Sequence, residues 1–157
     1  MSDRKGVLTE IFKVNKPIIG MVHLRPLPGS PGYDPSIMGM KEITRIALEE
    51  ARILEDNGVD GVQVENIWDF PYLKGEKIGP ETAAALGVVA ARVGETVGIP
   101  VGVDCHLNGG RIALAAAIAS DARWIRVFEW VNAYISHAGL TEGIGAELAR
   151  DRHALRA

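Results

Sequence analysis

The sequence predicts an α/β fold in which parallel strands alternate with helices, and three observations lead to it. Short apolar runs begin near residues 17, 59, 100 and 124. A segment whose apolar residues recur at helical spacing follows each run. No signal for a β-hairpin joins any two runs, so serial βα units and right-handed crossovers are expected. We therefore expect a single domain over residues 1–157; periodicity leaves open a small open sheet or half of an eight-stranded barrel.

The first unit is the clearest of the four. Residues 17–24, PIIGMVHL, read as a buried strand after Lys16. Residues 25–40 contain four prolines, so neither a helix nor a central strand can cross them, and they are predicted to form a long loop. A helix over 41–57 follows, with Asn57-Gly58 as its C-terminal stop.

The other units repeat this order of strand, loop and helix. The pattern predicts strands at 59–66, 100–106 and 124–129, helices at 80–97 and 110–120, a connecting segment at 130–142 and a last helix at 143–156. The second helix opens with Gly79-Pro80-Glu81, which places proline at the first helical position and an acid in the first turn.

The composition excludes several classes of protein. With 47% apolar and 24% charged residues the chain can bury a core. A net charge of −3 and scattered lysines and arginines argue against a nucleic-acid partner. One cysteine builds no disulfide framework, and neither a signal peptide nor a run of about 20 apolar residues is present. We expect a cytoplasmic protein without a transmembrane segment.

Polar residues gather toward the carboxyl end of each predicted strand, on one face by the alternation of strand side chains. Ligand sites in parallel α/β folds lie at that edge. We therefore predict one pocket at this edge. The candidate catalytic residues are His23, Glu65, Asp104 and His106, and the candidate substrate-binding residues are Gln63, Asn66, Asn108 and Arg126.

Two other interpretations of this polar set remain open. It could be a structural network in which Arg126 pairs with Glu65 or Asp104 and His23 bonds a loop carbonyl. It could also hold a divalent metal of unassigned identity, since Asp104 and His106 place two ligand types on one strand face. No other cofactor is indicated. Cys105 has the opposite parity and is expected in the core.

The loops supply weaker candidates. Asn108-Gly109-Gly110 precedes a helix and could present backbone N–H groups to a phosphate. His137 and Glu142 fit a lid or rim, whereas His153 reads as an exposed surface residue. Four aromatic residues could line a pocket mouth or pack loops together: Trp68, Phe70, Tyr72 and Trp130.

Several segments match one family pattern, and the most specific lies first in the chain. Residues 16–24, Lys-Pro-Ile-Ile-Gly-Met-Val-His-Leu, are followed by Pro-Leu-Pro-Gly-Ser-Pro at 26–31. The further matches are residues 58–66 with their Glu-Asn ending, residues 80–82, residues 133–136, and residues 139, 140, 142 and 143. These segments resemble the BtpA family over nearly the whole chain.

The resemblance implies a TIM (β/α)8 barrel of the ribulose-phosphate-binding type. A complete barrel takes about 250 residues, so the chain would be its N-terminal half. The resemblance carries over His23, Glu65, Asn66 and Arg126. Family members typically have Asn at the position of Asp104, Leu at that of His106 and Asn at that of Phe128, so part of the pocket is altered.

The function implied is that of a small-molecule enzyme with a phosphosugar-like ligand and an unassigned reaction of lyase or isomerase type. The alternatives are an inactive half barrel and a non-catalytic assembly factor, as in photosystem I biogenesis. The factor would lie peripherally at a membrane and bind through Trp68, Phe70 and Tyr72. A half barrel leaves two unpaired edges, so either a homodimer that closes the barrel or a fragment is expected.

Overall fold

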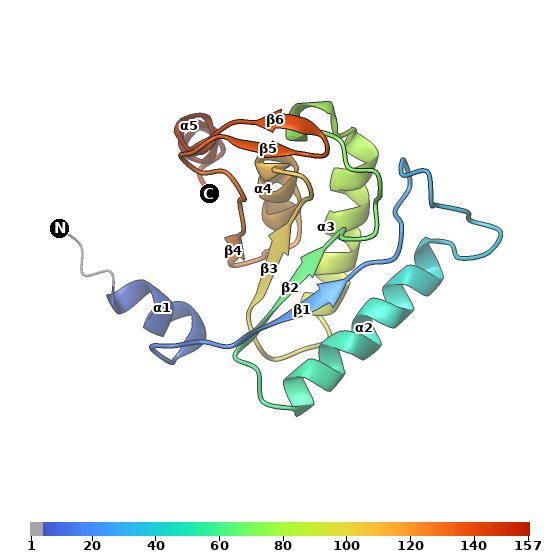
Figure 1. Cartoon of the computed structure of the whole chain (residues 1–157). Coiled ribbons are helices and arrows are strands. Elements are labelled where there is room, and N and C mark those ends of the chain that lie inside the picture. The colour runs from blue at the N-terminus through green and yellow to red at the C-terminus, as the bar shows by residue number, and fades with distance from the viewer. Residues whose placement is uncertain (1–4) are drawn as a thin grey trace.

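The computed structural model describes residues 5–157, whose core is a four-stranded parallel sheet in the order β1-β2-β3-β4 (Figure 1). The strands are β1 (Ile19–His23), β2 (Gly61–Glu65), β3 (Val101–Asp104) and β4 (Trp124–Ile125). The helices are α1 (Lys5–Phe12), α2 (Met40–Asp56), α3 (Pro80–Gly94), α4 (Gly110–Ala119) and α5 (Gly145–Leu155), with a short 3-10 turn η1 (Gly75–Lys77). The four predicted βα units and their parallel order are confirmed.

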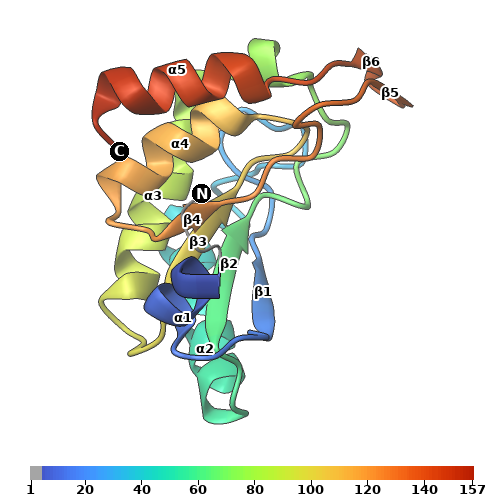
Figure 2. The same ribbon diagram turned by 90° about the vertical axis from the view of Figure 1, so that its left-hand side faces the viewer.

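One face of the sheet packs against α2, α3 and α4 (Figure 2). Val22, Val62, Val64 and Val103 lie on this face and are fully buried, each stabilising the fold by about 1.5–3 kcal/mol. Cys105 joins the same core, as its parity predicts. Small residues on α3 and α4 let these helices approach closely. The polar residues that alternate with these core residues along the strands therefore point to the opposite, inner face.

The inner face is apolar at its amino-terminal end, where the helix α1 lies against it. This helix was not predicted from the sequence. Phe12 of α1 packs against Trp124 with ring centroids 4.9 Å apart. The indole of Trp124 lies directly over Gly102, where an added Cβ would meet a ring atom at 2.1 Å. Glycine is thus required at Gly102 by the close approach of this ring. The pair Phe12 and Trp124 forms a floor beneath the polar residues.

The fourth strand is shorter than the predicted 124–129. The backbone N–H of Arg126 still donates to the Val103 carbonyl at 3.0 Å, but β3 ends at Asp104 and leaves nothing for later residues to pair with. Residues beyond β4 consequently leave the sheet and turn across its carboxyl edge.

No hairpin joins any two of β1–β4, as expected, but the segment after β4 contains a hairpin that the sequence did not predict. Within the segment predicted to be a connection, β5 (Tyr134–Ser136) pairs antiparallel with β6 (Gly139–Thr141). The turn is closed by Ser136, whose Oγ donates to the Gly139 carbonyl at 3.1 Å, and by Gly139 at φ 96°. Its central residues, His137-Ala138, carry no usual turn signal. The hairpin lies beyond the carboxyl ends of β2 and β3 (Figure 2).

The structure also bears on the predicted loop after β1 and on the predicted absence of a transmembrane segment. Residues 25–39 contain no helix or strand, as their prolines predict. Within the described part of the chain, no helix is both long and apolar enough to cross a membrane.

Candidate functional site

Sheet register places three polar side chains side by side at the carboxyl edge. His23 pairs with Glu65, and Glu65 pairs with Asp104, so one row of the ladder ends in these residues. All three have the parity of the inner face. His106 follows Asp104 by two residues and returns to the same side. The predicted convergence of strand-end residues is therefore present in the structure.

Glu65 is the centre of the polar row. Its Oε1 lies 2.8 Å from Nε2 of His23. Its Oε2 accepts from Nε2 of Gln63 at 3.0 Å and from Nη1 of Arg126 at 3.4 Å. Gln63 in turn accepts from the indole N–H of Trp124 at 3.2 Å. The buried carboxylate is thereby compensated, as burial of a charge requires.

His23 and Arg126 reach from this buried carboxylate toward solvent. Their side chains are 43% and 45% exposed, whereas that of Glu65 is 2% exposed. Arg126 also lies over the ring of Phe128, with its guanidinium carbon 4.6 Å from the ring centroid. A ligand at the edge could therefore meet an imidazole and a guanidinium.

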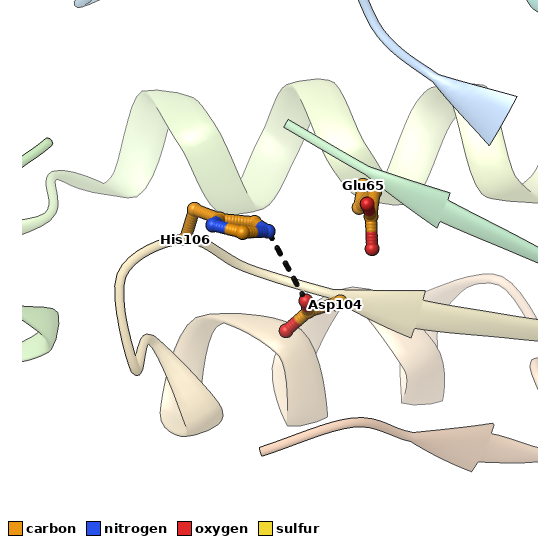
Figure 3. Close-up of side chains that lie close together, drawn as sticks. All are labelled: Glu65, Asp104 and His106. Carbon is orange, nitrogen blue, oxygen red and sulfur yellow. Dashed lines mark ion pairs between the residues drawn. The ribbon is translucent and has the colours of Figure 1, made fainter. Parts of the chain in front are cut away.

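Asp104 and His106 form the less compensated half of the site (Figure 3). Nε2 of His106 lies 3.5 Å from Oδ2 of Asp104 and Arg126 lies 3.9 Å from the same oxygen, but residues 5–157 supply a hydrogen bond to neither side chain of the pair. Burial, with repulsion from Glu65, raises the pKa of Asp104 to about 7. Burial lowers the pKa of His106, which favours the neutral imidazole.

Asn66 positions His106 and does so through a chain of loop contacts. Its Oδ1 accepts from the backbone N–H of His106 at 2.8 Å, and its Nδ2 donates to Oδ2 of Asp69 at 2.8 Å. Oδ1 of Asp69 accepts from the backbone N–H of Leu27 at 2.7 Å. The loops that follow β1, β2 and β3 are thus tied together. Burial raises the pKa of Asp69 despite these donors.

Asn108 braces the hairpin segment. Its Oδ1 accepts from the backbone N–H of Glu129 at 2.9 Å, and its Nδ2 donates to the carbonyl of Glu142 at 3.0 Å. Gly109 and Gly110 are explained by packing, because an added Cβ would lie 2.7 Å from Cys105 Sγ or from Ile144. Both amides already bond groups of the protein. A substrate contact through Asn66 or Asn108 therefore stays a prediction.

A cavity of about 450 Å³ opens beside His106 and beneath the hairpin. Tyr72 lines this cavity, and the centroid of its ring lies 5.1 Å from that of His106 and 5.3 Å from that of His137. Phe128 closes another wall at 4.7 Å from His106. A larger apolar groove of about 1160 Å³ runs along Trp124 and Leu148, away from the polar row. The smaller cavity is the candidate ligand pocket because His106, one of the polar residues of the edge, lines it.

The structure brings together six of the eight predicted site residues: His23, Gln63, Glu65, Asp104, His106 and Arg126. Sequence reasoning missed Asp69 as the link between loops, and no spacing signal points to it. His137 was predicted at a lid or rim and does line the cavity. His153 is exposed, as expected.

The fold and the site together define an α/β protein built from four βα units, as in half of a (β/α)8 barrel, with its polar residues at the carboxyl edge of the sheet. The model of the BtpA family matches residues 14–157, and the chain belongs to this family.

Three relatives illustrate the range of the family. An uncharacterized protein of Pyrococcus abyssi is 39% identical over 90% of this chain and 52% of its own length. An uncharacterized protein of Thermococcus kodakarensis is 40% identical over 89% of this chain and 52% of its own. The photosystem I biogenesis protein BtpA of Synechocystis is 35% identical over 94% of this chain and 50% of its own. The chain thus spans about half the length of these relatives. No solved structure matches the chain.

Proposed function

We propose that the carboxyl edge of this sheet binds a small phosphosugar-like anion and carries out an acid–base reaction of lyase or isomerase type. The observation that carries the proposal is the arrangement around Glu65. One buried carboxylate holds both an imidazole and a guanidinium, and each of these is nearly half exposed.

His23 is the proposed general acid or base. A carboxylate 2.8 Å from one imidazole nitrogen orients the ring, as in other acid–base pairs. Glu65 is itself buried, so it is suited to position His23. A substrate proton would reach Glu65 from the open carboxyl edge of the sheet.

Arg126 is the proposed anion-binding residue. Its guanidinium has donors beyond the one directed at Glu65, and a planar fork suits phosphate oxygens. The adjoining cavity of about 450 Å³ is within the range of small-molecule sites. His106, Tyr72 and Phe128 would contact the uncharged part of the ligand.

We also propose that a second half completes the sheet to a barrel of the ribulose-phosphate-binding type, supplied by a second copy of the chain. In the described residues β1 and β4 each have one neighbouring strand, so both edges can accept another. The apolar groove along β4 supports this proposal because it places apolar side chains beside the open edge of the sheet.

The proposal is tested with pentose and hexose phosphates. Arg126→Met is expected to weaken binding about 10- to 100-fold in a calorimetric titration, because a charged hydrogen bond contributes about 1.5–3 kcal/mol. The matched control is Arg45→Met, on the exposed face of α2. Unchanged binding in the Arg126 variant, or no binding by the parent chain, would contradict the proposal.

The acid–base step has its own readout. Exchange of the proton next to the sugar carbonyl in deuterated water, followed by NMR, needs no knowledge of the product. His23→Gln is expected to slow this exchange by about 10²- to 10⁴-fold while leaving phosphosugar binding in place. Equal exchange rates in the parent chain and the variant would remove His23 from the chemistry.

A second candidate function is that of a non-catalytic assembly factor, because the Synechocystis relative is named a photosystem I biogenesis protein. Trp68 and Phe70, each 51% exposed, lie next to one another and offer an aromatic contact surface. In this case Trp68→Ala and Phe70→Ala abolish co-purification of the partner, whereas Arg126→Met does not. The enzyme proposal predicts the reverse sensitivity for phosphosugar binding.

A further inference from the structure

We propose that Glu65, Asp104 and His106 form a binding site for a divalent transition metal, with Zn²⁺ as the best match. The inference goes beyond the proposed function, which is argued from His23, Glu65 and Arg126 and assigns no metal. It is drawn from the geometry of the three side chains and from the buried polar atoms of Asp104 and His106 that lack a hydrogen bond in the described residues.

Geometry is the first argument for the metal. One ligand atom from each of these three side chains lies within 4.8 Å of the other two, so one ion can lie between them. Glu65 and Asp104 end adjacent strands at paired positions, and their carboxylates face a common space with the ring of His106 (Figure 3). Two of the three ligands are therefore held by the sheet itself.

Unpartnered atoms are the second argument. Asp104 is 1% exposed and His106 is 7% exposed. Both oxygens of Asp104 and both nitrogens of His106 are buried, and none of these atoms makes a hydrogen bond of good geometry within the described residues. The two side chains approach each other at 3.5 Å, and Arg126 lies 3.9 Å from Asp104. Buried polar atoms are nearly always hydrogen-bonded, so this pair can accept a ligand from outside the protein. A metal ion would take an oxygen of Asp104 and a nitrogen of His106.

The surrounding contacts have the character of a supporting shell. His23 and Gln63 each contact an oxygen of Glu65, which fixes how the carboxylate is turned. Asn66 holds the backbone of His106 in place. Such outer contacts typically orient metal ligands and keep their geometry.

Charge at the site is compatible with a dication. Glu65 and Asp104 supply two negative charges when ionised, and Arg126 supplies one positive charge at 3.4 and 3.9 Å from them. A dication therefore leaves the site with one net positive charge, which suits an anionic ligand. Arg126 is nearly half exposed and can turn toward solvent when the ion binds.

The ligand set selects among metals. An imidazole ligand favours Zn²⁺ and other divalent transition metals, and Zn²⁺ also accepts carboxylates, whereas Mg²⁺ and Ca²⁺ prefer oxygen ligands alone. Three protein ligands leave a coordination position open for water or a ligand, as in catalytic zinc sites.

The test titrates the metal-stripped chain with Zn²⁺ by calorimetry, and with Co²⁺ by visible absorption as a spectroscopic substitute. We expect one equivalent to bind. Asp104→Asn and His106→Leu are each expected to lower the affinity by about 100-fold, at the upper end of the losses that even outer-shell changes cause. Circular dichroism checks that each variant folds. The control is His153→Ala, an exposed histidine on α5.

Each outcome decides the matter. Loss of binding in either folded variant, with the control unchanged, supports the site. Failure of the parent chain to bind Zn²⁺ or Co²⁺, or unchanged affinity in both site variants, overturns it. Should one variant not fold, the other and the Co²⁺ spectrum of the parent chain still decide. No sugar phosphate is present, so a negative result here leaves the phosphosugar proposal standing, and Arg126→Met tests that proposal separately.

Discussion

Asp104 and Glu65 occupy neighbouring positions in the sheet but have different surroundings. Glu65 has three side-chain partners at 2.8–3.4 Å, whereas the ion-pair partners of Asp104, His106 and Arg126, lie farther away at 3.5 and 3.9 Å. This contrast explains why the pKa of Asp104 rises to about 7. At the residue scale, the chemistry of the edge thus depends on which carboxylate has close hydrogen-bond and ion-pair partners.

The raised pKa of Asp104 predicts a pH-dependent stability. The folded state binds this proton more tightly than the unfolded state does, so Asp104 stabilises the fold at low pH and loses that contribution as pH rises from about 4 to 7. In the presence of a chelator, Asp104→Asn removes this dependence. We expect the variant to gain about 2–3 kcal/mol in free energy of unfolding over the parent chain between pH 5 and 8.

Denaturant unfolding of both chains at several pH values measures this difference. A parallel pH dependence in Asp104→Asn and the parent chain would show that the pKa of Asp104 is not raised.

At the scale of elements, the strands and helices follow from local sequence, but the hairpin and α1 do not. The βα units were predictable because strand runs, helix stops such as Asn57-Gly58, and the start at Pro80 are local signals. The hairpin depends on Ser136, which bonds Gly139 in a turn without a usual sequence signal, and on the brace from Asn108 to Glu142, which lie far apart in the chain. Neither contact produces a periodic pattern in the sequence.

The same reasoning applies to the site. Strand parity placed six predicted residues at one edge, because alternation is a property of any strand. It could not reveal that Asn66 and Asn108 are spent on bracing loops, since their partners lie on other segments. The pairing of strand ends was predictable, and the hydrogen bonding beyond them was not.

The floor of the inner face yields a prediction for β3. Gly102→Ala places a methyl group against the indole of Trp124, so the ring must move, and we expect a loss of about 1–3 kcal/mol in stability. Gly6→Ala is the matched control, because its Cβ meets no atom within 4 Å and alanine favours the helix α1. Thermal unfolding of the two variants measures the difference. Equal melting temperatures would contradict the close packing of Trp124.

At the scale of the whole molecule, the sheet has helices on one face and a partly open inner face. The apolar groove beside β4 continues from Val7 of α1 to Leu148 of α5. Apolar surface of this kind is typical of an interface. Because several elements form this groove, association of the chain depends on the whole folded unit and not on one element.

We expect the chain to form a dimer in solution, as measured by light scattering. Val7→Lys places a charge in the groove without touching the sheet, and is expected to shift the mass toward that of the monomer. Ile37→Lys is the control, because Ile37 is 81% exposed in the loop after β1 and does not line the groove. A monomeric parent chain, or equal dissociation by both variants, would contradict the dimer.

The floor made by Phe12 and Trp124 has an electrostatic consequence. The rings of Phe12 and Trp124 cover the amino-terminal side of the row of carboxylates. A low-dielectric wall of this kind directs the field of the buried charges toward the opposite, carboxyl side. Cations in solution are accordingly drawn toward the carboxyl edge, and their capture rate should fall as ionic strength increases.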